Sequence, residues 1–277
     1  MNRTLSQFAD GTSYYFRNYY RSRSFFLMLI VTLLVSSLLT YFSLRYIGKL
    51  PKLFPGIPTN LSASLKERLL GFLWALILLD LPVFASVFFG SPAISGEIEN
   101  KTAYHIFPLP IARGVLLLSK YFAAVLITLS VLLIYLLFQG GVLLYIFGTL
   151  PLNYFSSIGL LVIFTFSIVA FTFLVSSIFN RNTYAYISVF LIYFLVFEAI
   201  NVISEFLYKT TPFYLLDNAA AIISKVYVNA GTGLFSSSLS INAASSSEIF
   251  SSVLIIVIYG VISIVAALII FQRKEAY

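Results

Sequence analysis

Two acidic residues stand inside long apolar stretches of the sequence, where a charge is costly. Asp80 lies near the middle of one stretch and is followed by Pro82, while Glu198 lies in another, one helical turn before Asn201. A charged side chain at the centre of a bilayer costs at least about 2.5–3.5 kcal/mol, so such residues usually face protein or water. We therefore take Asp80, Glu198 and Asn201 as candidates to line a path for ions or cargo. The alternative for Asp80 is a protonated or paired carboxyl group that packs beside the proline bend.

The remaining reactive residues exclude most enzyme chemistry. The chain has no Cys and a single His, His105. It therefore lacks a thiolate nucleophile, a Cys-ligated metal and a His-rich metal site, and a lone His is more often structural than a ligand. No Gly-x-x-x-x-Gly-Lys-Ser/Thr loop is present to bind the phosphates of ATP. We expect no catalytic residue, metal site or cofactor in this chain, and we predict that it is not an enzyme by itself.

The composition indicates which medium surrounds the protein. Of 277 residues, 60% are hydrophobic and 10% are charged, and the mean hydropathy is +0.98. An average soluble domain is roughly 45–50% apolar and about 25% charged. The net charge of +7 fits Lys and Arg residues beside a membrane better than nucleic-acid binding. These values predict an all-α polytopic membrane protein in contact with lipid, and they exclude a soluble enzyme, a nucleic-acid reader and a disordered tail.

Six segments meet the length of about 20 mostly apolar residues that a spanning helix needs. The 60 residues between Lys120 and Arg181 carry no charge. As one helix they would measure roughly 90 Å, about three bilayer cores, so the run must fold back, and Gly148 and Pro151 mark the turn. The predicted spans are residues 25–47, 69–89, 115–138, 158–179, 184–204 and 249–271. The apolar stretch of the third span continues past Gly140-Gly141, where the chain is expected to be either a bent helix or a re-entrant segment.

Six spans place both ends of the chain on one side of the membrane. With the N-terminus inside, ten of the 17 Lys and Arg residues are cytoplasmic, a weak positive-inside bias. We therefore predict an N-in, C-in protein of the plasma membrane, with residues 272–277 as a cytoplasmic tail.

Three segments outside the spans have recognisable character. Residues 1–24 interleave aromatic and Arg side chains, which predicts a cytoplasmic helix in the headgroup layer, either touching a soluble partner or serving as a plain anchor. Residues 48–68 contain three prolines and the glycosylation sequon at Asn60 and are expected to form an irregular external loop. Residues 213–228 predict a short external helix lying on or dipping into the outer leaflet, followed by a flexible connector at residues 231–247.

A short charged helix is predicted at the cytoplasmic face between the second and third spans. Ser91 is a good N-cap and Pro92 fits the first helical position. Glu97 and Lys101 are one turn apart in the favourable order, and Pro108 ends the helix. Because two spans hold such a helix, it can transmit motion to or from a soluble partner. The alternative is an ordinary connector.

The same segment carries a motif of charged and small residues. It has a Gly-Glu-x-Glu-x-x-Thr stretch, then an apolar-aromatic segment, then Pro-x-x-Arg with a Lys seven residues further on, formed by Gly96, Glu97, Glu99, Lys101, Thr102, Pro110, Arg113 and Lys120. With these residues the segment resembles the permeases of ATP-binding-cassette exporters of the ABC-2 type. The family usually has Gly before that Thr, so Lys101 is a departure. The six spans, the N-terminal helix and the external helical piece also match the family layout.

The resemblance implies a membrane subunit of an ATP-driven exporter. It implies two six-span subunits, identical or different, bound to separate ATPase subunits that hold ATP and Mg²⁺. The candidate coupling residues are Gly96, Glu97, Glu99, Lys101, Thr102 and Arg113, and Lys120 is expected to extend to the inner interface as an anchor. The alternative function is a secondary transporter or channel that uses Asp80 and Glu198, which the span number and the lack of internal repeats disfavour.

Overall fold

The structure, a computed structural model, describes residues 3–49, 61–102, 111–230 and 239–274. His105, Pro108, Pro110 and the sequon residue Asn60 lie outside the described residues, as do residues 231–238 of the expected connector. The predictions made for these residues therefore stay predictions.

Six helical segments among the described residues are long and apolar enough to cross a membrane. This confirms the all-α polytopic class. The segments are α2 (Arg23–Tyr46), α4 (Ala63–Gly90) with the short helix η2 (Ser91–Ala93), α7 (Arg113–Phe147), α8 (Leu152–Ile178), the consecutive helices α9 (Asn182–Phe190), η3 (Leu191–Val196) and α10 (Phe197–Tyr208), and α13 (Ser246–Arg273). A 3₁₀ turn, η1 (Ile47–Lys49), follows α2.

Serine caps extend two spanning helices beyond the predicted limits. The Ser62 hydroxyl accepts a hydrogen bond from the Leu65 N–H, and α4 begins at Ala63. The prediction of an irregular loop is therefore wrong for residues 63–68, which are helical. At the start of α13, Ser245 and Glu248 form a reciprocal capping box. Both arrangements satisfy N–H groups that a helix leaves unpaired at its start.

Helix α7 continues without interruption through Gly140-Gly141, which excludes the re-entrant alternative. Tyr154 of α8 fills the space beside Gly140, where an added Cβ would lie 2.9 Å from the Tyr154 hydroxyl oxygen. That hydroxyl donates to the carbonyl of Leu136 at 2.8 Å. The helix ends at Gly148, whose φ of 75° is the left-handed conformation that suits glycine. The predicted turn is confirmed.

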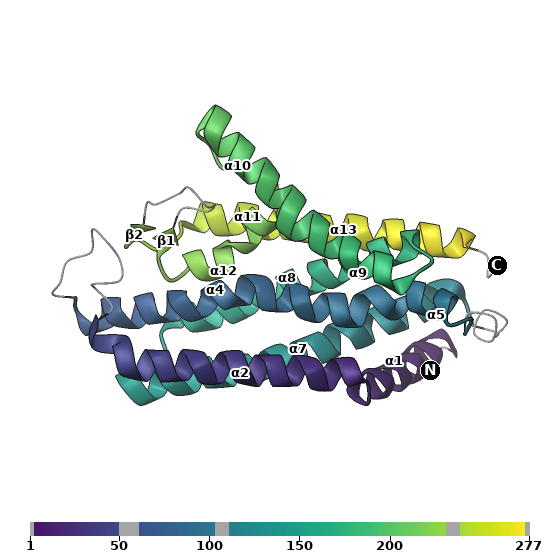
Figure 1. Cartoon of the computed structure of the whole chain (residues 1–277), viewed down its shortest axis with the longest axis horizontal. Helices are drawn as coiled ribbons and strands as arrows, with labels where there is room; N and C mark the ends of the chain where they lie inside the picture. Colours follow the sequence, from purple (N-terminus) through teal and green to yellow (C-terminus); the bar gives the residue numbers. More distant parts are fainter. Residues whose placement is uncertain (1–2, 50–60, 103–110, 231–238, 275–277) are drawn as a thin grey trace.

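The helices form a bundle with a buried centre and flanking helices that expose apolar side chains. In the most apolar stretches of α4, α7 and α8, 61%, 56% and 67% of residues are buried, against 22% in α2, in α9–α10 and in α13. Helix α2 packs on α7, α13 packs on α8, and α4 lies against both α7 and α8 (Figure 1). The three central helices therefore carry the core, and the three flanking spans expose apolar side chains.

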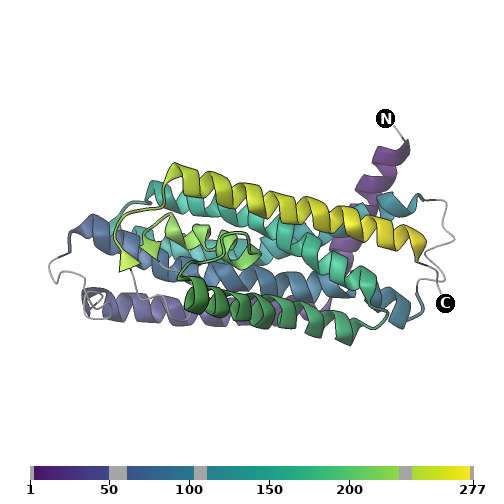
Figure 2. The ribbon, with the colours of Figure 1, turned by 90° about the horizontal axis from the view of Figure 1, so that it is seen from above.

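The first helix, α1 (Arg3–Tyr20), lies across the bundle end instead of continuing along it (Figure 2). It packs on the start of α7, where a Cβ added at Gly11 would lie 2.9 Å from the Ser119 hydroxyl oxygen. The predicted helix at residues 1–24 is thus present, and its contact with a membrane surface stays a prediction.

The fifth span is divided by the π-helical turn η3. Helix α9 packs near α4 and α8, whereas α10 diverges from the bundle beyond η3 (Figure 1). π-Helical turns of this kind occur often at functional sites.

The segment after α10 enters the bundle, the deeper of the two placements expected for residues 213–228. It forms two short helices, α11 (Leu216–Ala220) and α12 (Ile222–Lys225), followed by a two-residue antiparallel pair of β1 (Asn229–Ala230) and β2 (Leu239–Ser240). Ile223 and Tyr227 are completely buried. Hydroxyl and amide groups of α8 satisfy this backbone, because Ser157 donates to Ile223 O at 2.9 Å and Asn153 donates to Val226 O at 2.6 Å.

Both chain ends lie at the same end of the bundle, together with the helix α5 (Ser95–Glu99), while β1 and β2 lie at the opposite end (Figure 1). This arrangement agrees with six spans. The assignment of this end to the cytoplasm stays a prediction.

Candidate functional site

Helix α5 follows directly from α4 through η2, and a serine from a distant helix caps it. The Ser176 hydroxyl of α8 accepts hydrogen bonds from the N–H groups of Ile94 and Ser95 at 3.2 and 3.1 Å, and it donates to Ser91 O at 2.5 Å. Ser91 itself makes no side-chain cap, and its buried hydroxyl oxygen has no partner among the described residues. The predicted N-cap at Ser91 is therefore wrong, because Ser176 takes that position.

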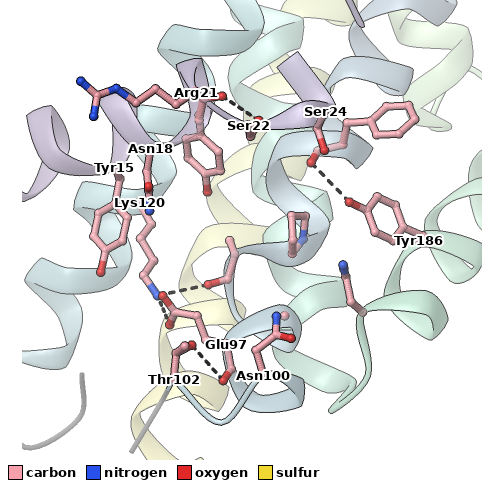
Figure 3. Close-up of a pocket in the computed structure, with 16 residues that line it drawn as sticks. Tyr15, Asn18, Arg21, Ser22, Ser24, Glu97, Asn100, Thr102, Lys120 and Tyr186 are labelled. Carbon is pink, nitrogen blue, oxygen red and sulfur yellow. Dashed lines mark hydrogen bonds and ion pairs between the residues drawn. The ribbon is translucent and has the colours of Figure 1, made fainter. Parts of the chain in front are cut away.

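Glu97 connects α5 to α7 through a buried lysine. The Lys120 side chain is 1% exposed, forms an ion pair with Glu97 Oε2 and donates to Ala93 O at 3.1 Å. Its ammonium group lies 5.2 Å from the centre of the Tyr15 ring of α1. Burial, followed by the Glu97 carboxylate, raises the pKa of Tyr15 well above its usual value. The prediction that Lys120 extends to the interface is wrong, because the ion pair holds it inside the protein (Figure 3).

Glu99 connects α5 to α9. One carboxylate oxygen accepts a hydrogen bond from the backbone N–H of Asn182 at 2.8 Å. Asn182 is the first residue of α9, and the residue before it makes no side-chain cap. A carboxylate at a helix N-terminus pairs with an otherwise free N–H and with the positive end of the helix dipole. Glu99 is therefore an N-cap supplied from another helix.

The backbone at the end of α5 has a conformation that suits the glycine of the family pattern, although this chain has Lys101 there. Lys101 has φ 59°, the left-handed region that glycine occupies at little cost. Helix α5 ends at Glu99, so the expected one-turn pair of Glu97 and Lys101 has no helix to support it, and Glu97 pairs with Lys120 instead. Thr102 donates from its hydroxyl to Glu97 O at 3.2 Å and closes this turn.

Two further candidate residues have structural contacts of different kinds. Gly96 is buried against Pro92, where an added Cβ would lie 3.3 Å from the proline Cβ. The guanidinium of Arg113 donates to Gln272 O and Lys274 O at 2.9 and 3.1 Å, at the end of α13.

The chain end is tied to the bundle up to Lys274, so this part of residues 272–277 is not a free tail. Lys274 Nζ donates to Ser177 O and Phe179 O at 2.8 and 2.9 Å, at the end of α8. A cation next to the last carbonyl groups of a helix is favourable, while burial lowers the pKa of Lys274 to about 8.

A cavity of about 560 Å³ opens beside the Glu97–Lys120 pair (Figure 3). Its walls come from α1, the start of α2, the end of α4, α5, α7 and the start of α9. Glu97, Gly96 and Thr102 line it, so the structure brings three of the six candidate coupling residues to one cavity, and Glu99 and Lys101 lie on the exposed side of the same segment.

The three residues predicted to line a path for ions or cargo lie further along the bundle, and their surroundings differ from one another. Asp80 is exposed on α4 and has no hydrogen bond or ion pair within the described part of the chain. Asn201 is 4% exposed and donates to Asp217 Oδ2 at 2.6 Å, while its own Oδ1 accepts from Asn218 at 2.6 Å. Glu198 is half-buried one turn before Asn201. Asn201 thus joins α10 to α11.

The sequence profile described as "ABC-2 family transporter protein" matches residues 15–276. The chain belongs to the ABC-2 transporter family. It is a multi-pass membrane protein and a permease subunit of an ABC transporter. No curated protein sequence matches it.

Sequence reasoning about this ABC-2 permease missed the residues that support its candidate site. Ser176, which caps α5, stands in a serine pair like others in the chain and gives no signal. Asn182 stands in a short polar stretch between two predicted spans, and nothing in that stretch points to Glu99 as its partner. Asp217 and Asn218 gave a usable signal, because they are adjacent polar residues in a half-apolar segment.

Proposed function

We propose that this permease is the membrane subunit of an ATP-driven exporter in the plasma membrane. It pairs with a second permease subunit, and separate ATPase subunits bind ATP and Mg²⁺ and supply the energy. The contacts of α5 support this proposal, since one five-residue helix is joined to four spanning segments.

Each of these connections is specific. Helix α5 continues from α4 through η2, Ser176 of α8 caps its start, Lys120 of α7 pairs with Glu97, and Glu99 caps α9. A soluble subunit that displaces α5 would therefore shift the ends of all four helices together. The exposed residues Glu99, Asn100, Lys101 and Thr102 offer the contact surface.

The cargo path in this proposal passes Asp80 and Glu198. Asp80 is exposed in the single chain, and a second subunit that covers this face would remove it from lipid. The family assignment favours this function over the secondary transporter or channel. No observation among the described residues supports that alternative.

Crosslinking tests the coupling surface, because a chain without Cys accepts a single reactive position. Asn100→Cys, carrying a photoreactive crosslinker and co-expressed with its candidate ATPase subunit, should form a permease–ATPase adduct. Tyr145→Cys is the matched control, because Tyr145 is 81% exposed at the far end of α7. Equal adducts from both positions, or none from Asn100→Cys in a correctly inserted protein, would refute the proposal.

A further inference from the structure

Three arginines at the junction of α1 and α2 have no bonded partner in the described part of the chain. Arg17 lies in the last turn of α1, Arg21 follows that helix, and Arg23 is the first residue of α2. All three are exposed, and their guanidinium groups form no hydrogen bond or ion pair with any described residue. The backbone N–H of Arg21 bonds to Arg17 O at 3.2 Å. The helical turn therefore continues, and it places the side chains of Arg17 and Arg21 on one face.

The acidic residues near this junction are engaged elsewhere or lie apart from it. Residues 11–66 contain no Asp or Glu. Glu97 forms its ion pair with Lys120, and Glu99 caps α9. Asp10 lies about two helical turns before the nearest of the three arginines. Among the described residues, the junction thus carries three positive charges without a bonded counter-charge.

Helix α2 indicates where this junction lies in the membrane. Between Arg23 and Arg45 the helix has 21 residues without a charge, which span about 31 Å at about 1.5 Å per residue, close to the thickness of a hydrocarbon core. Only 22% of its most apolar stretch is buried, and Phe26, Ile30 and Leu34 are 55%, 62% and 56% exposed. An uncharged helix of this length fits the hydrocarbon core from end to end, so Arg23 lies at its edge, where lipid phosphate groups begin.

Helix α1 keeps the other two arginines near the same depth. It crosses the bundle end instead of leading away from it (Figure 2). Its exposed tyrosines Tyr14 and Tyr20 are of the residue type that gathers at the headgroup layer. Figure 3 shows the Arg21 guanidinium directed outwards, away from the Glu97–Lys120 pair. This side chain is therefore open to a partner outside the protein.

We infer that Arg17, Arg21 and Arg23 form a binding site for the headgroups of acidic phospholipids in the leaflet at this end of the bundle. Guanidinium groups bind phosphate through paired N–H donors. An acidic lipid adds a net negative charge, whereas a zwitterionic lipid brings a cation of its own that the three arginines repel. This lipid site does not depend on the proposed export function.

Lipid titration of the purified full-length permease in a neutral detergent tests the site. Phosphatidylglycerol should raise the midpoint of thermal unfolding and bind about tenfold more tightly than phosphatidylcholine at low ionic strength. Salt screens exposed charges, so this preference should disappear at about 1 M NaCl. Equal binding of the two lipids at low salt, or a preference that salt leaves unchanged, would refute the site.

Substitution of the three arginines locates the site. Each change of Arg17, Arg21 or Arg23 to Gln should weaken phosphatidylglycerol binding about fivefold, and the triple Gln variant should bind it no better than phosphatidylcholine. The triple Lys variant keeps the charges and should retain most of the preference, which separates lost charge from a folding defect. Arg45→Gln is the matched control, because Arg45 is an exposed arginine at the opposite end of α2 and already donates to the Tyr41 hydroxyl at 2.6 Å.

Three results would overturn the inference. Unchanged phosphatidylglycerol binding in the triple Gln variant would exclude the arginines as the site. An equal loss in Arg45→Gln would indicate a general charge effect. A triple Gln variant that keeps its lipid preference but no longer retains an ATPase subunit would assign the arginines to a protein partner.

Discussion

The Glu99 carboxylate and the backbone N–H of Asn182 form a 2.8 Å hydrogen bond although they are 83 residues apart in the sequence. The bond joins the exposed end of α5 to the start of the fifth span. Because that span contains the π-helical turn η3, a shift of α5 can be relayed to a helix that is not regular along its length.

The cap supplied by Glu99 can be tested by hydrogen exchange. Replacing an N-cap residue by Ala costs roughly 0.5–2 kcal/mol, so Glu99→Ala should speed amide exchange in the first turn of α9 by about fivefold. Asp10→Ala, which removes an exposed carboxylate from α1, should leave that turn unchanged. Unaltered exchange in Glu99→Ala would show that the bond does not protect α9.

The Glu97–Lys120 pair should behave as a coupled unit. Glu97→Gln leaves Lys120 buried without its counter-ion, and removing one partner of a buried pair typically costs about 3–5 kcal/mol. The double variant Glu97→Gln with Lys120→Met removes both charges, so it should recover much of that loss. Thermal unfolding of the single and double variants measures the coupling, and strictly additive effects would contradict a buried pair.

Position 101 should prefer glycine to the residue it holds. Lys101 has φ 59°, a conformation that costs an L-residue roughly 1–2 kcal/mol. Lys101→Gly should therefore slow proteolytic cleavage of this turn, while the β-branched substitution Lys101→Val should speed it. Faster cleavage in Lys101→Gly than in the wild type would mean that flexibility outweighs the relieved strain.

Substitution of Asp80 tests whether its charge acts in transport. Asp80→Asn keeps the shape and removes only the charge. If the carboxylate acts on cargo, transport should fall about tenfold, which corresponds to ~1.4 kcal/mol in the barrier, while expression and assembly hold. Asp10→Asn removes an exposed charge from α1 and should transport normally. Full transport in Asp80→Asn would exclude a role of this charge in transport.

The sequence by itself determined the class of the protein and the number of its spans. A stretch of about 20 apolar residues in a bilayer must satisfy its backbone internally, so each run becomes a helix whatever its neighbours are. The turn at Gly148 and Pro151 followed from local backbone preferences, and the stretch from Gly96 to Lys120 carried the family resemblance, which the profile match bears out.

Only the tertiary structure decided how the candidate site is held together. Hydropathy placed Lys120 within a span but could not identify Glu97 as its partner. The local sequence predicted an N-cap at Ser91, whereas Ser176 supplies that cap in the structure. Asn201 likewise bonds to Asp217 and Asn218 across a turn between two helices. A residue's hydrophobicity is a property of its own segment, whereas the partner of a buried polar group depends on which helices pack against it. That packing brings together residues up to 161 positions apart, as for Arg113 and Lys274.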